Sequence, residues 1–264
     1  MRIAGSTVLI TGASSGIGAA TARAVARAGG RPVLLARSAG TLHELATELG
    51  GGVRAYAVDC ADRHAVALVA PLIADEVGTP DVVVNNAGAG RWLYLEETEP
   101  EELEAMIGAP YLAAAFVTRA FLPAMIERGS GLIVNVNSPV AFVPWPGAVG
   151  YGAARWALRG LDELLRMDLA GTGIHVSQVV PGPVSSDYIL HNPGVAESFP
   201  GIAKLIPTLT PDQVAKTIVR AIERERRLVF TPFVLRALLS FDRMVPRLVP
   251  WFTRRTGRKR VPRP

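Results

Sequence analysis

The sequence predicts a single α/β domain built on a doubly wound parallel sheet of the Rossmann type. Short apolar runs alternate with longer helical patterns along most of the chain, which is the rhythm of consecutive βαβ units. Several short runs, such as residues 82–84, are apolar at every position, as expected of strands that helices cover on both faces. With 264 residues, 49% of them apolar, the chain can fill the core of one large domain.

The expected elements follow in order from this alternation. Short runs rich in valine, leucine and isoleucine, bounded by turn-forming residues, predict strands at residues 7–10, 32–36, 53–58, 81–85, 131–136, 175–180 and 228–230. Longer segments whose apolar residues recur every three or four positions predict helices at residues 19–28, 41–49, 64–76, 100–128, 151–169 and 211–224. We expect no segment to span a bilayer, because prolines and glycines interrupt the longest uncharged run, residues 129–154.

The basic charge of the chain is confined to its end. The formal net charge is +5, but eight of the 28 basic residues and none of the 23 acidic residues follow Asp242. The remaining body is mildly acidic, which argues against a nucleic-acid-binding fold with a basic face. The single cysteine, Cys60, excludes a disulfide framework, and no histidine spacing indicates a metal site. One lone thiol also favours a reducing compartment, so we expect a cytoplasmic protein.

A glycine-rich turn joins the first expected strand to the first helix. It reads Thr11-Gly12-Ala13-Ser14-Ser15-Gly16-Ile17-Gly18. Glycines at these points let the chain turn sharply and let backbone amides approach a pyrophosphate at the helix N-terminus. The alternative is a tight turn with packing glycines. The position between a strand and a helix favours a dinucleotide site.

Three further motifs stand at the ends of later strands. Asn85-Asn86-Ala87-Gly88 follows the fourth strand, Ser138 follows the fifth, thirteen residues before Tyr151, and Pro181-Gly182 follows the sixth. With the glycine turn, this set resembles the short-chain dehydrogenase/reductase family over roughly residues 5–230. The resemblance implies a nicotinamide-dependent oxidoreductase.

The resemblance also implies a role for each matching position. Gly12, Ser14, Gly16, Ile17 and Gly18 would hold the pyrophosphate, and Ser15 in the same turn would also bind the cofactor. Asp59 and the Cys60 backbone would contact the adenine, Asn86 would lie beside the adenine ribose, Val184 and Ser186 would meet the nicotinamide amide, and Tyr151 with Arg155 would contact the nicotinamide ribose.

The residue after the second strand bears on the choice of cofactor. An NAD site would place an acid there to accept the ribose 2′-hydroxyl, whereas Arg37 suits the 2′-phosphate of NADP. We therefore expect NADP rather than NAD. The alternative is that Arg37 is only a solvated charge at the strand end, and Ser15 replaces the basic residue that many NADP-preferring relatives carry.

Two positions depart from the family's catalytic pattern. In relatives a tyrosine is the general acid/base, a serine polarises the substrate oxygen, and a lysine one helical turn after the tyrosine stabilises the tyrosinate. Ser138 and Tyr151 match, but the lysine position holds Arg155, which supplies a fixed positive charge and cannot pass a proton on. The family's asparagine falls on Pro110. We expect Pro110 to kink its helix and leave the Met106 carbonyl free for a water.

These residues predict an NADP-dependent oxidoreductase that transfers a hydride between the nicotinamide and a hydrophobic ketone or secondary alcohol, with Tyr151 as general acid/base. A hydrophobic substrate is expected because residues 142–146 and the loop from Pro181 to about Pro207 are apolar. Ordinary packing of a lid is the alternative. Because both departures affect proton resupply to Tyr151, a catalytically impaired relative is the rival function, either a redox sensor or an inactive partner subunit.

The chain is predicted to consist of a cofactor-binding and catalytic domain, residues 1–230, and a C-terminal extension, residues 231–264. The extension is apolar and then basic. It could lie on an anionic membrane surface, or pack over the substrate cleft or a neighbouring subunit. In many relatives the helices that correspond to residues 100–128 and 151–169 form the subunit interface, which implies a homodimer or homotetramer.

Overall fold

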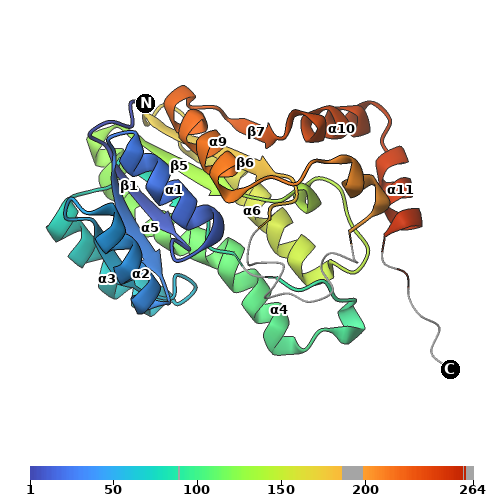
Figure 1. Cartoon of the computed structure of the whole chain (residues 1–264), viewed down its shortest axis with the longest axis horizontal. Helices are drawn as coiled ribbons and strands as arrows, with labels where there is room; N and C mark the ends of the chain where they lie inside the picture. The colour runs from blue at the N-terminus through green and yellow to red at the C-terminus, as the bar shows by residue number, and fades with distance from the viewer. Residues whose placement is uncertain (89, 186–198, 258, 260–264) are drawn as a thin grey trace.

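The centre of the protein is one seven-stranded parallel sheet (Figure 1). The computed structural model describes residues 1–88, 90–185, 199–257 and 259. The strands lie in the order β3-β2-β1-β4-β5-β6-β7. The chain runs outward from β1 through β2 to β3, then returns to the other side of β1 with β4. At such a switch point the connecting loops diverge and open a crevice at the carboxyl ends of the strands. The predicted Rossmann-type fold is confirmed.

The strands coincide with the apolar runs of the sequence. They are β1 (Thr7–Thr11), β2 (Arg31–Ala36), β3 (Arg54–Ala57), β4 (Val82–Asn85), β5 (Gly131–Val136), β6 (Ile174–Pro181) and β7 (Leu228–Thr231). Every residue of β1, β4 and β5 is buried, whereas the edge strand β3 is largely exposed. Burial on both faces explains why the central strands are apolar throughout rather than alternating.

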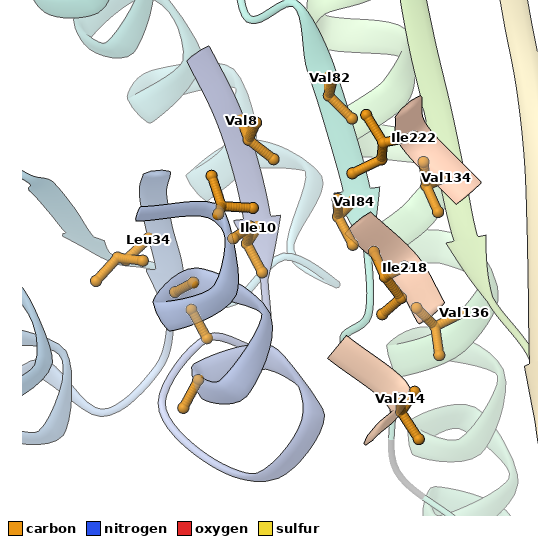
Figure 2. Close-up of a cluster of buried hydrophobic side chains, with 14 of the residues drawn as sticks. Val8, Ile10, Leu34, Val82, Val84, Val134, Val136, Val214, Ile218 and Ile222 are labelled. Carbon is orange, nitrogen blue, oxygen red and sulfur yellow. The ribbon is translucent and has the colours of Figure 1, made fainter. Parts of the chain in front are cut away.

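Helices cover both faces of the sheet. They are α1 (Gly16–Arg27), α2 (Ala39–Leu49), α3 (Arg63–Val77), α4 (Pro100–Ile107), α5 (Ala113–Arg128), α6 (Val149–Asp168), α9 (Pro211–Arg224), α10 (Phe233–Met244) and α11 (Leu248–Thr256). One core lies between the sheet and helices α1, α2 and α9, where Ile218 lies near Val84 and Val136 (Figure 2). A second core on the other face is closed by α3, α5 and α6.

The helix expected over residues 100–128 is divided in the structure. α4 ends at Ile107, a π-helical turn spans Gly108–Leu112, and α5 begins at Ala113. Pro110 lies inside the turn and has no N–H to donate, so the regular hydrogen-bond ladder cannot continue through it. The helical run expected over residues 100–128 is thus present, with a π-helical turn inside it. The expected irregularity at Pro110 is present.

The same run also corrects the expectation about membrane spans. Together, α4, the π-turn and α5 (Pro100–Arg128) form the one helix among the described residues that is long and apolar enough to cross a bilayer. Nearly half of its apolar window is buried in the protein, and Val117 and Phe121 pack in the second core. Core helices of α/β proteins pass the same test of length and composition, so the feature is weak evidence for a membrane span.

The chain ends in two helices at the far side of the sheet from α2 and α3 (Figure 1). Leu235 and Leu239 of α10 and Val249 of α11 form a small core with Val143 and Ile206. This core ties the C-terminal helices to the loops that follow β5 and β6. Those loops also border the crevice at the strand ends.

We expect Ile218→Ala to lower the free energy of unfolding by about 2–5 kcal/mol, because Ile218 is fully buried between α9 and the sheet. Lys216→Ala on the exposed side of the same helix is the control, with an expected change within about 0.5 kcal/mol. Urea denaturation of both variants measures the difference. Equal effects of the two substitutions would contradict the packing described for α9.

Candidate active site

A cleft of about 840 Å³ opens at the carboxyl ends of the strands, where the order of the sheet reverses. It brings together residues from stretches far apart in the sequence, between Gly12 and Phe199. The predicted site residues that line it are Gly12, Ser14, Ser15, Gly16, Ile17, Arg37, Asp59, Cys60, Asn86, Ser138, Tyr151, Arg155 and Val184. Gly18 is buried behind the glycine turn, and Ser186 and the loop around Tyr188 lie outside the described residues.

The glycine turn forms one end of the cleft, between β1 and α1. Gly12 and Gly16 have φ of +65° and +51°, a region that side chains with a Cβ rarely adopt. A Cβ on Gly18 would overlap the carbonyl of Gly12. Asn86 Nδ2 donates to the carbonyls of Thr11 (3.2 Å) and Gly12 (3.3 Å) and so braces the turn from the side of β4. The turn is thus fixed with the N-terminus of α1 facing the cleft, an arrangement that suits a pyrophosphate.

The ends of β2 and β3 supply the residues beside this turn. Arg37 directly follows β2, is exposed, and lines the cleft. Asp59 Oδ1 accepts a hydrogen bond from the N–H of Ala61 (2.9 Å), which shapes the turn before α3. Burial raises the pKa of the Cys60 thiol to about 12, with a smaller contribution from the charge of Asp59. Cys60 therefore carries no reactive thiolate at neutral pH.

The predicted catalytic residues meet at the other end of the cleft. Ser138 follows β5, and its Oγ lies 3.5 Å from the N–H of Val140. Tyr151 lies in the first turn of α6 and is buried, and Arg155 follows it by one helical turn. Arg155 Nη1 donates to the carbonyl of Val136 (2.9 Å), and its Cζ lies 5.1 Å from the centre of the Tyr151 ring. A serine hydroxyl, a tyrosine and a buried cation therefore line one cavity.

Arg155 is a buried charge with few partners. Its Nε has no hydrogen-bond partner, and among the described residues no carboxylate forms an ion pair with its guanidinium. A Cβ on Gly88 would lie 2.5 Å from Nη2, so the guanidinium packs directly against this glycine. A buried cation without an acidic partner favours an anion next to it. A tyrosinate or a negatively charged ligand would meet that need.

Aromatic side chains surround Tyr151 on the substrate side of the cleft. The Trp92 ring centre lies 5.7 Å from that of Tyr151 and 5.3 Å from those of Trp145 and Phe199. Trp145 and Phe199 are in contact as well, at 5.7 Å. The sequence indicated Trp145 through the apolar run 142–146 but gave no reason to select Trp92 or Phe199. The only local signal for Trp92 is its place in the loop after Asn86-Ala87-Gly88, at the end of a site strand.

Two acids at the mouth of the cleft were also not predicted. Glu101 and Glu104 of α4 are exposed and line the cleft. Their position follows from the path of α4 across the opening, which the sequence does not specify. Their charge disfavours an anionic substrate at this entrance.

A row of buried polar side chains crosses the sheet near the carboxyl ends of β4, β5 and β6. Asn85, Asn135 and Gln178 lie at the same register on β4, β5 and β6. Asn85 Nδ2 donates to Asn135 Oδ1 (2.7 Å), Asn135 Nδ2 donates to Asp162 Oδ1 (2.5 Å), and Gln178 donates to the other oxygen of Asp162. Asp162 belongs to α6, the helix that carries Tyr151 and Arg155. The row therefore fixes α6 against the strands that lead to Ser138 and Pro181.

Comparison with known proteins agrees with this geometry. Residues 6–191 match the family model of the short chain dehydrogenases. The chain is 31% identical over 250 residues to estradiol 17-beta-dehydrogenase 11 of Homo sapiens, covering 92% of this chain and 80% of that protein.

Two solved structures are similar over most of their length. A short chain dehydrogenase/reductase from Burkholderia phymatum in complex with NAD has a TM-score of 0.82 at 25% identity, over 94% of this chain and 97% of that one. An alcohol dehydrogenase from the archaeon Thermococcus sibiricus complexed with 5-hydroxy-NADP has a TM-score of 0.73 at 29% identity, over 85% and 95%. The two neighbours carry nicotinamide nucleotides of both kinds.

We expect the stability of this protein to depend on the ionisation of Asp162, because burial raises its pKa from 3.8 to about 7. Between these values the folded protein keeps a proton that the unfolded chain has lost. The resulting stabilisation is complete below about pH 4 and is lost as the pH rises through 7, an effect of up to about 4 kcal/mol. Asp162→Asn cannot titrate.

Urea denaturation of both proteins between about pH 4.5 and 7.5, a range set by the two pKa values of Asp162, checks this expectation. The wild type should lose stability relative to Asp162→Asn as the pH rises. Parallel profiles for the two proteins would show that the carboxyl of Asp162 is ionised in the folded state throughout this range.

Proposed function

This chain belongs to the short-chain dehydrogenase family, and we propose that it is an NADP-dependent oxidoreductase that interconverts a hydrophobic ketone and the matching secondary alcohol. The observation that carries the proposal is the single cleft with a glycine turn and Arg37 at one end and Ser138 and Tyr151 at the other. A nucleotide that spans this cleft would reach from the residues that suit its phosphates to a tyrosine that can exchange a proton.

The cofactor site fits a nicotinamide nucleotide. Gly12 and Gly18 of the turn leave no room for a Cβ against Ala87 and the Gly12 carbonyl, so the backbone can turn tightly at the cleft, and Arg37 is exposed in the cleft wall. When bound, the nicotinamide supplies or accepts the hydride. The 2′-phosphate of NADP would lie near Arg37, whose fork of N–H groups suits a phosphate better than a hydroxyl.

The catalytic end assigns one task to each residue. Tyr151 would give a proton to the substrate oxygen during reduction and remove it during oxidation. Ser138 would donate a hydrogen bond to the same oxygen and hold it beside Tyr151. The buried charge of Arg155 would stabilise the tyrosinate that remains after proton transfer, since no carboxylate of the described residues forms an ion pair with it.

The substrate pocket favours a neutral, apolar molecule. Trp92, Trp145 and Phe199 form an aromatic wall next to Tyr151, and Glu101 and Glu104 place negative charge at the opening. A flat apolar ketone would stack on such a wall, whereas a carboxylate or phosphate would be repelled at the entrance. The relative named for its action on estradiol supports this substrate class.

The rival function is a nucleotide-binding protein with impaired turnover, and one observation favours it. Arg155 is anchored to the carbonyl of Val136, and its planar guanidinium cannot release a proton. Pro110, in the π-turn before α5, has no side-chain group that could carry a proton. Neither Arg155 nor Pro110 can therefore relay protons by its side chain. Such a protein would bind the nucleotide as a redox sensor or as an inactive partner subunit.

The proposal includes a homodimer or homotetramer assembled through α5 and α6. These helices expose the apolar side chains of Ile126, Trp156, Leu164 and Met167. Large apolar side chains exposed on a helix are typical of subunit interfaces.

A direct binding titration tests the cofactor assignment without a guess about the substrate. We expect NADPH to bind at least about tenfold more tightly than NADH, and Arg37→Asp to reverse the order, because the carboxylate would repel the phosphate and accept the 2′-hydroxyl. Arg31→Asp at the exposed start of the same strand is the matched control and should leave both affinities unchanged. A preference for NADH would refute the NADP assignment, and no binding of either nucleotide would refute the oxidoreductase.

Arg155→Lys distinguishes the enzyme from its rival. If Arg155 limits proton supply to Tyr151, lysine should raise kcat for a hydrophobic ketone about tenfold or more, since an ammonium can exchange protons with water. Tyr151→Phe is the control, and it should abolish turnover while it retains NADPH binding. Absence of turnover in both the wild type and Arg155→Lys, with NADPH bound, would favour the non-catalytic function.

A further inference from the structure

The two C-terminal helices present an apolar face to solvent. Seven large apolar side chains of α10 and α11 are exposed, as is Val245 between the two helices, and those of Phe233 and Met244 are exposed by 76% and 81%. The opposite side of α10 is apolar too, because Leu235 and Leu239 pack in the small core with Val143. A surface helix in water normally has one apolar stripe. A second stripe on the outside indicates an apolar environment outside the protein.

The same two helices carry more positive charge than their one acid, Asp242, can balance. Arg236, Arg247, Arg254 and Arg255 are exposed, and within the part of the chain that the structure describes none of them forms an ion pair. No acidic residue follows Asp242 in the sequence. Trp251 contacts both Phe252 and Arg255, so aromatic and cationic groups are interleaved at the surface.

This combination selects among the partners that could cover the face. A second copy of the chain would bring the arginines of two identical faces together, and like charges would repel. A nucleic acid would satisfy the arginines but not the apolar side chains. The surface of an anionic bilayer satisfies both, since apolar groups enter the acyl boundary while arginines meet phosphate headgroups.

The helices are also joined to the substrate end of the cleft. Thr253 Oγ1 donates to the carbonyl of Pro144 (3.2 Å), next to Trp145. Thr256 Oγ1 accepts from the N–H of Gly201 (2.9 Å), two residues after Phe199. The loops that carry Trp145 and Phe199 are therefore both hydrogen-bonded to α11. In Figure 1, α10 and α11 lie together at the end of the molecule opposite α2 and α3.

We propose that α10 and α11 dock this protein on an anionic lipid bilayer and that the substrate end of the cleft takes its apolar ligand from that surface. The docking step depends only on the C-terminal helices. The source of the substrate rests on the function proposed above.

Flotation of the full chain with phosphatidylcholine vesicles, with and without about 30 mol% phosphatidylserine, tests the docking step. The protein should float with the anionic vesicles and remain behind with the neutral ones. The double substitution Arg254→Gln/Arg255→Gln should weaken binding at least about tenfold, because each surface arginine contributes about a factor of five. Lys216→Gln/Arg220→Gln on α9 removes the same charge from another face and should have no comparable effect.

Met244→Ser tests the apolar component, and Leu68→Ser on α3 is its control because Leu68 is exposed to a similar degree, 75%. Only Met244→Ser should weaken flotation. Equal binding to both vesicle types, no binding to either, or equal effects of the substitution and its control would overturn the proposal. A fall in oligomer mass on Met244→Ser, measured without lipid, would assign the face to a second copy of the chain.

A kinetic measurement tests the source of the substrate. For a ketone dissolved in anionic vesicles, Met244→Ser should raise KM, while kcat/KM for a short water-soluble ketone should not change. Equal effects on both ketones would overturn membrane delivery. Flotation needs no turnover, so the docking step stands or falls independently of whether the protein is an oxidoreductase.

Discussion

Burial of both faces of the central strands is the constraint on which the rest of the structure depends. No residue of β1, β4 or β5 is exposed, so these strands can present no group to a ligand along their length. Groups that contact a ligand must follow the last residue of a strand, as Arg37, Asn86 and Ser138 do. Because all strands run parallel, these residues share one edge of the sheet, and the reversal between β1 and β4 opens that edge into the cleft.

The polar exceptions inside the sheet stabilise the site from beneath. A buried amide group without a partner costs about 1–3 kcal/mol, and the side-chain NH2 groups of Asn85, Asn135 and Gln178 each donate a hydrogen bond, whereas Asn85 Oδ1 has no partner. The carboxyl of Asp162 accepts from two of them and thereby links α6 to β5 and β6. Since Tyr151 lies on the same helix, this link sets the rotation and the axial position of α6 relative to β5, the strand that precedes Ser138.

Charge and shape are distributed unequally along the cleft. The end at the glycine turn consists of backbone amides, small residues and Arg37, whereas the other end consists of large rings around Tyr151 and the buried cation Arg155. The rings come from three loops, and α11 holds two of those loops in place through Pro144 and Gly201. The C-terminal helices are therefore part of the support of the substrate pocket.

The sequence by itself determined the strands, the glycine turn and the spacing of Ser138 and Tyr151, because continuous apolar runs and local turns depend on neighbours in the chain. Tertiary structure alone decided that Trp92 and Phe199 meet beside Tyr151 and that Asp162 joins two strands. Such contacts depend on the register and crossing of segments far apart in sequence, which periodicity does not encode. Proline chemistry predicted an irregular helix at position 110, but only the packed helix shows a π-turn.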